Sequence, residues 1–122
     1  MLQIRDLQEG AAPDVVTAND VSRRLLLAQG DDGLSARRVD FGFKQRRLFA
    51  ARPDQLRDDL GELGLVPMPP RPVSGVEGDM ILSVEASPWA ADFDRLETIA
   101  ATVASRLGWI CTGWCAEVSE RL

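Results

Sequence analysis

The chain has 122 residues, of which 45% are hydrophobic, and its 19 acidic and 14 basic side chains give a net charge of -5. This length and apolar content are sufficient for one packed core, so a single domain is expected. The acidic balance disfavours direct binding to a phosphate backbone, because nucleic-acid affinity comes largely from basic side chains. No apolar run is long enough to cross a membrane, and the first residues lack a signal-peptide pattern, which predicts a cytoplasmic protein.

The chain contains no histidine and two cysteines. Nucleophiles of the Ser-His and Cys-His types are therefore excluded, and the commonest general base at neutral pH is missing. Cys111 and Cys115 lie in a predicted strand, where four residues span about 13 Å, so a disulfide between them is not expected. Two thiols also fall short of a zinc site. Most hydrolase mechanisms are therefore removed, and these residues offer no candidate catalytic residue, cofactor site or metal site.

The first 16 residues show only a weak apolar pattern and are interpreted as an appended segment before a domain at 17–122. Thr17 and Asp20 resemble a helix capping box. Apolar residues at helical spacing follow them, and Gly30 is suited to end the helix. The sequence thus predicts an N-terminal helix over 17–29.

The segment 39–43 alternates apolar and polar residues, which is the pattern of a half-buried strand. The polar run 44–47 is interpreted as the exposed end of this strand or as a turn. Leu48 and Phe49 are then expected to return to the core.

The remaining elements follow the same rules. Pro53 at a helix start and leucines at helical spacing predict a helix over 53–64. Prolines restrict any strand at 65–68 to the edge of a sheet. A strand is predicted at 80–86, then a helix that opens at Ser87-Pro88 or at Asp92 and ends at Gly108, and a last strand at 109–118.

Two βαβ-like halves predict an α+β fold of the ferredoxin-like type, a four-stranded antiparallel sheet with two helices on one face. The N-terminal helix at 17–29 is the candidate cover for the opposite face of the sheet. Trp114 has the strand parity opposite to that of Cys111 and Cys115. If the small side chains lie under the helices, Trp114 points to the opposite face.

The sequence contains pairs of like-charged residues. The acidic pairs are Asp31-Asp32, Asp58-Asp59 and Asp92 with Asp94. They are interpreted as solvated groups rather than as acid/base couples or magnesium ligands. The arginine pairs Arg37-Arg38 and Arg46-Arg47 are interpreted as surface groups that balance nearby acids. The alternative is a basic patch that docks an acidic or phosphorylated partner.

Three motifs in this order, Gly30-Asp31-Asp32, then Arg37-Arg38-Val39-Asp40-Phe41, then Gly113-Trp114, resemble the RraB family of regulators of ribonuclease E. The similarity covers roughly residues 18–118. It implies a bacterial, ferredoxin-like domain without catalytic activity that binds ribonuclease E and modulates RNA decay.

The predicted partner-binding residues are Gly30, Asp31, Asp32, Arg38, Asp40 and Trp114. The expected partner is a protein, ribonuclease E or a relative of it, with no direct contact to nucleic acid or membrane. Two alternatives stay open at this point. One is a small-ligand or RNA-binding module, and the other is a homo-oligomer that associates through an unpaired sheet edge.

Overall fold

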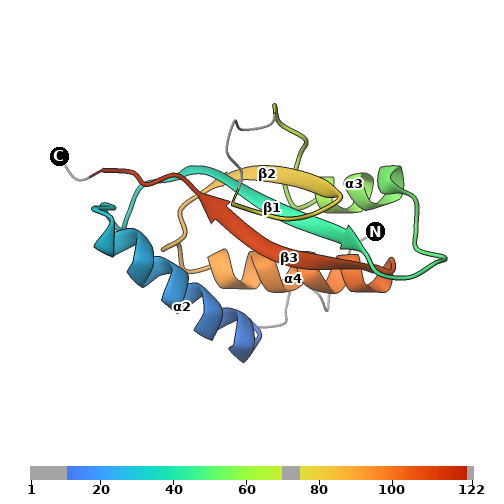
Figure 1. The fold of residues 1–122 in the computed structure, drawn as a ribbon, viewed down its shortest axis with the longest axis horizontal. Coiled ribbons are helices and arrows are strands. Elements are labelled where there is room, and N and C mark those ends of the chain that lie inside the picture. Colours follow the sequence, from blue (N-terminus) through green and yellow to red (C-terminus); the bar gives the residue numbers. More distant parts are fainter. Residues whose placement is uncertain (1–10, 70–74, 121–122) are drawn as a thin grey trace.

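The computed structural model describes residues 11–69 and 75–120 and has an α+β architecture (Figure 1). In chain order the elements are α2 (Pro13–Ala28), β1 (Arg37–Gln45), α3 (Pro53–Gly61), β2 (Met80–Ala86), α4 (Phe93–Arg106) and β3 (Trp109–Ala116). The strands form one antiparallel sheet in the order β2-β1-β3. The prediction of an α+β fold with these helices is confirmed at this level.

Where four strands were predicted, the described residues hold three. The segment 65–68 makes only a single antiparallel bridge, in which Val66 and Ser83 exchange backbone hydrogen bonds of 2.9 and 2.7 Å. Pro67 and Pro69 lie on either side of Met68, and neither proline has a backbone N–H to donate to a β-ladder. Pairing beside β2 is therefore confined to Val66 in this part of the chain.

Helix α2 begins at Pro13, four residues before the predicted start at Thr17. Proline is favoured in the first turn because its missing N–H would have no helical partner there. Thr17 donates its hydroxyl to the carbonyl of Pro13 at 3.0 Å, so the predicted capping box does not form. Gly30 ends the helix with a positive φ of 98°, and Asp31 N then donates to Leu26 O, as predicted for a glycine-terminated helix.

The core lies between the sheet and helices α3 and α4. The alternating residues of β1 that face it are Val39, Phe41 and Phe43, all fully buried. Their partners from the two helices include Leu56, Leu60, Phe93, Ala100 and Val103. The alternating apolar residues of β1 and the apolar residues at helical spacing in α4 therefore pack together in one cluster, as the sequence predicts.

A β-bulge in β3 reverses the predicted orientation of Trp114. Gly42 pairs with Gly113 and Phe43 pairs with Cys111, so Thr112 is an extra residue on β3. The bulge changes the side-chain parity, and both Cys111 and Trp114 consequently pack against the core. The Trp114 ring lies edge-on to Phe93 at 5.0 Å between centroids. The predicted placement of Trp114 on the opposite face was wrong, because uninterrupted alternation was assumed.

Helix α2 does not cover the opposite face of the sheet, in contrast to the prediction. It lies on the same side of the sheet as α4 and packs beside that helix (Figure 1). Segment 75–79 crosses the opposite face instead, where Thr112 donates its hydroxyl to Glu77 O. A side chain at Gly42 would collide with Glu77 O and Val76, so this strand position requires glycine.

Replacing Gly42 with alanine is expected to lower the free energy of unfolding by about 1–3 kcal/mol, because segment 75–79 must move away from β1. Urea denaturation of Gly42→Ala checks this value. Gly61→Ala is the matched control, since a methyl group there meets no atom within 4 Å. Equal effects of the two substitutions would contradict the steric explanation.

Candidate functional site

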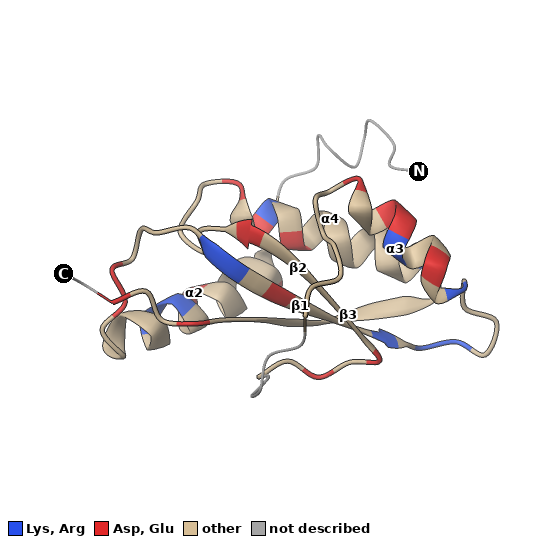
Figure 2. Ribbon diagram, turned by 90° about the horizontal axis from the view of Figure 1, so that it is seen from above, with Lys and Arg blue, Asp and Glu red and all other residues tan. Residues whose placement is uncertain are grey.

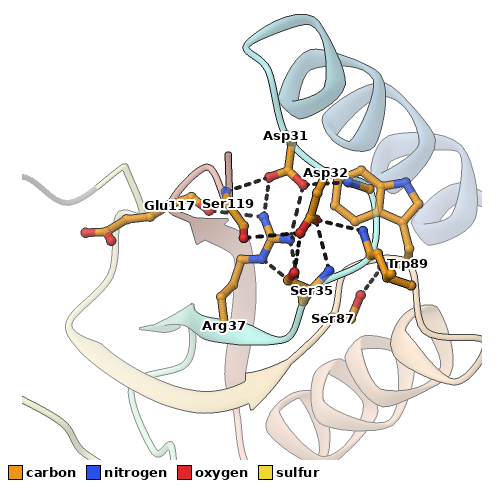
Figure 3. Close-up of polar contacts among 10 residues, drawn as sticks. Asp31, Asp32, Ser35, Arg37, Ser87, Trp89, Glu117 and Ser119 are labelled. Carbon is orange, nitrogen blue, oxygen red and sulfur yellow. Dashed lines mark hydrogen bonds and ion pairs between the residues drawn. The ribbon is translucent and has the colours of Figure 1, made fainter. Parts of the chain in front are cut away.

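Asp31, one of the predicted partner-binding residues, is fully buried and forms the centre of a polar cluster (Figure 3). Its carboxylate accepts hydrogen bonds from the backbone N–H groups of Gly33 at 2.9 Å and Ser119 at 3.0 Å, and it pairs with the guanidinium of Arg37. Arg37 also lies 5.5 Å from the centroid of the Trp89 ring. The cluster therefore joins the end of α2, the start of β1 and the segment that follows β3.

The contacts of the Asp31 cluster determine the protonation of its two acids. Burial opposes ionisation of Asp31, but the hydrogen bonds from Arg37, Gly33 and Ser119 outweigh it and lower its pKa. Asp32 accepts hydrogen bonds from the hydroxyl and N–H of Ser35 and from Leu34 N, which hold its pKa far below the ordinary range. Both carboxylates are thus ionised at neutral pH, and groups of the protein itself donate hydrogen bonds to them.

Arg38 and Asp40 form a second polar contact, on β1. Asp40 is 1% exposed and accepts hydrogen bonds from Arg38 Nε at 2.8 Å and from the Ser83 hydroxyl at 2.6 Å. The register places Ser83 of β2 directly beside Asp40. This pair therefore connects the two strands on the face of the sheet away from the core.

Trp114 belongs to a third network, between α2, α4 and β3. Its indole N–H donates to Asn19 Oδ1 at 2.8 Å, and Asn19 Nδ2 donates to Asp94 at 2.8 Å and Glu97 at 2.9 Å. Arg23 binds both carboxylate oxygens of Asp94, at 2.7 and 2.9 Å. Asn19 is 2% exposed, so its side chain acts as a buried connector between the helices and the sheet.

The six predicted partner-binding residues do not converge on one surface. Gly30, Asp31 and Asp32 lie at the end of α2, Arg38 and Asp40 lie on the outer face of β1, and Trp114 is partly buried against the core. Asp31 and Asp40 are withdrawn from solvent by their arginine contacts. A direct role of these residues in binding a partner stays a prediction.

Both cysteines are free, as predicted. Burial raises the pKa of the Cys111 thiol to about 11, so the reactive thiolate is scarce at neutral pH. We expect Cys111 to resist iodoacetamide at pH 7 in the folded protein, as measured by peptide mass spectrometry. Labelling of Cys111 as fast in the folded chain as in urea would contradict this expectation.

The two most exposed of the large apolar side chains described follow Arg46-Arg47 in a loop, and the sequence did not identify them as binding residues. Leu48 is 87% exposed and Phe49 is 94% exposed, which overturns their predicted return to the core. The loop, here called the 46–49 loop after Arg46, Arg47, Leu48 and Phe49, directly follows the polar end of β1. The sequence did contain a signal for this exposure, because the polar run 44–47 predicts a turn and residues that follow a turn need not face the core.

Hydrogen bonds on both sides hold the 46–49 loop in place. Before its apolar tip, the N–H groups of Arg46 and Arg47 donate to Gly108 O at 3.0 and 3.2 Å. After it, Ala51 N donates to Leu107 O at 2.8 Å, and Ala51 O accepts from the Trp109 indole at 2.8 Å. The apolar tip is therefore presented by a fixed backbone.

Basic side chains precede and follow this tip along a chain whose net charge is negative. Figure 2 shows blue segments at the end of β1 and in the loop that follows it. The exposed members are Lys44, Arg46, Arg47 and Arg52, and none of them forms an ion pair with another residue in 11–69 or 75–120. The 46–49 loop thus combines an apolar tip with neighbouring basic side chains that have no ion-pair partner among the described residues.

Within the described ranges, no group of three or more histidine, cysteine, aspartate or glutamate side chains has the arrangement of a metal site. None of the helices described has the length and apolar content required to span a membrane. Comparisons with protein-family models, with curated proteins and with solved structures found no match to this chain.

Proposed function

We propose that this chain is a non-enzymatic regulatory protein that binds a partner protein through the 46–49 loop. The observation that carries the proposal is the near-complete exposure of Leu48 and Phe49 on a hydrogen-bonded loop. Exposed large apolar groups gain free energy when a partner buries them, and aromatic and arginine residues dominate binding energies at interfaces. A fixed loop also loses little conformational entropy on binding.

The charges around the loop define the partner surface that would fit. Four basic side chains without an ion-pair partner in the described part of the chain favour an acidic rim, and Leu48 with Phe49 favours an apolar cleft inside that rim. A bare phosphate backbone would satisfy the arginines and leave the apolar tip in water. A protein with an acidic, apolar-centred surface is therefore the partner that we propose.

The order of elements supports the finer assignment to the ferredoxin-like type. If Val66 is counted as a reduced strand beside β2, the elements after α2 follow the order βαββαβ. This order agrees with the resemblance to the RraB family. Ribonuclease E is accordingly the first partner to test, with modulation of RNA decay in the bacterial cytoplasm as the proposed outcome.

The test is a calorimetric titration of purified ribonuclease E with the wild-type chain and with the double variant Leu48→Ser/Phe49→Ser. Loss of two hot-spot side chains is expected to weaken binding by at least about tenfold. Leu34→Ser is the matched control, because Leu34 is 77% exposed and lies outside the 46–49 loop. Cleavage of a single-stranded RNA by ribonuclease E is measured in the same mixtures.

The outcomes separate the parts of the proposal. Wild-type affinity in the double variant would exclude the loop as the contact. No association of the wild-type chain at micromolar concentration would exclude ribonuclease E. Binding of the chain to the RNA alone would favour the RNA-binding alternative.

A further inference from the structure

A cavity of about 370 Å³ lies beside β3, which is an edge strand of the sheet. Helices α2 and α4 and the segment 75–77 form its walls. The side chains that matter for its chemistry are Asn19, Glu77, Glu97, Thr112 and Trp114. The bulge at Thr112 places Gly113 in the wall, so no side chain from that position fills the space.

Glu97 differs from three other shielded carboxylates of the described structure. Each of those three has an arginine partner, in the pairs Asp31 with Arg37, Asp40 with Arg38, and Asp94 with Arg23. Glu97 accepts a hydrogen bond from Asn19 but forms no ion pair with a described residue. Arg23 acts on Glu97 through its charge but does not form an ion pair with it, so a ligand cation in direct contact with Glu97 would stabilise its ionised form.

Neighbouring residues position the Glu97 carboxylate in the cavity wall. Asn19 fixes the Glu97 carboxyl at 2.9 Å and the Trp114 indole at 2.8 Å, so both groups are positioned before any ligand arrives. Glu77 also lines the cavity, and the described lining includes no lysine or arginine. The cavity is therefore a negatively charged recess with one aromatic wall.

We propose that this cavity binds a guanidinium or alkylammonium group, which forms an ion pair with the carboxylate of Glu97 and lies beside Trp114. The ligand supplies the positive charge that arginine supplies to Asp31, Asp40 and Asp94. A free amine or the side chain of a basic peptide would present the same group. The proposal stands on the cavity alone and does not depend on the role of the 46–49 loop.

Binding is expected to weaken as the pH falls. Burial raises the pKa of Glu97, and the charge of Asp94 raises it further, against the opposing effects of Asn19 and Arg23. The other charged or titratable groups that face this region are Glu77 across the cavity and Cys111 on β3. A bound cation favours ionised Glu97, so protonation of Glu97 at low pH and cation binding oppose each other.

The test is a titration of the full chain with agmatine, which carries both cationic groups, followed through the Trp indole N–H signals in ¹⁵N-correlated NMR spectra. We expect the Trp114 signal, assigned from Trp114→Phe, to shift more than those of Trp89 and Trp109. Glu97→Gln is expected to weaken binding by about tenfold or more, because a charge-assisted contact becomes a neutral one. Asp58→Asn removes the same charge at an exposed site on α3 and is the matched control.

Each result decides the proposal. An unshifted Trp114 signal at millimolar agmatine, or an agmatine affinity that Glu97→Gln leaves unchanged, would overturn it. Should Glu97→Gln fail to fold, Glu77→Gln replaces it, since Glu77 is exposed and a loss of affinity is again expected. Parallel titrations with putrescine and with an acetylated arginine peptide compare the two ligand sources, and selective binding of either one supports the site.

Discussion

Replacing Asp31 with asparagine is expected to lower the free energy of unfolding by about 3 kcal/mol, because Arg37 would lose its buried ion-pair partner and keep only the longer ion-pair contact of 3.4 Å with Asp32. The Arg37 side chain is only 8% exposed and Asp31 is fully buried. The substitution also weakens the acceptors for Gly33 N and Ser119 N, which tie distant segments together. Urea denaturation measures the loss.

The pH dependence of stability distinguishes this charge effect from a simple packing defect. The pKa of Asp31 is lowered in the folded chain from its ordinary value of 3.8. Its contribution to stability is therefore complete above that value and is lost as the pH falls below it. The difference in stability between the wild type and Asp31→Asn should narrow as the pH falls through this range, whereas a packing defect would leave it constant.

A double-variant cycle isolates the Asp31–Arg37 pair. Asp31→Asn/Arg37→Met removes both charges, and its loss of stability is expected to be smaller than the sum of the two single losses. Additive losses would show that the two side chains stabilise the chain independently. The exposed Asp58→Asn variant supplies the baseline for removal of one negative charge.

The second large effect is expected at Arg23, which joins α2 to α4. Arg23→Met leaves Asp94 beside Glu97 with Asn19 as their shared donor, so the like charges repel without a nearby arginine. We expect a loss of about 2 kcal/mol, below the value for a fully buried pair because Asp94 keeps some contact with water. Thermal and urea unfolding both measure it.

The control for Arg23→Met is a substitution of Asp20, the second ion-pair partner of Arg23. Asp20 contacts the same guanidinium at 2.7 Å but its side chain is 49% exposed, compared with 17% for Asp94. Asp20→Asn should therefore cost less than about 0.5 kcal/mol. A loss as large as that of Arg23→Met would show that the exposed pair, and not the link to α4, stabilises α2.

Local sequence rules predicted most of the elements correctly. Proline at the starts of α2 and α3, glycine after α2 and the alternation in β1 reflect preferences that act within a few residues. The start of α2 was misplaced by four residues because Thr17 was interpreted as a cap, whereas Pro13 begins the helix.

The candidate sites could be predicted only in part. Asp31, Asp40 and Trp114 were identified as special positions, but the sequence did not show that arginines and the core would enclose them. Exposure of Leu48 and Phe49 was missed because hydrophobicity alone predicts burial. Whether such residues reach the core depends on how the following turn is anchored, here at Gly108.

The sequence by itself determined the fold class, the helices, the free thiols and the exclusion of histidine-based chemistry. These depend on composition, on short-range periodicity and on the conformational limits of proline and glycine. Only the tertiary structure decided the face of Trp114 and the position of α2. It also decided the arginine partners of Asp31, Asp40 and Asp94, and that Glu97 forms no ion pair with a described residue. Those features follow from one inserted residue in β3 and from contacts between segments far apart in the chain, and neither leaves a local periodic pattern.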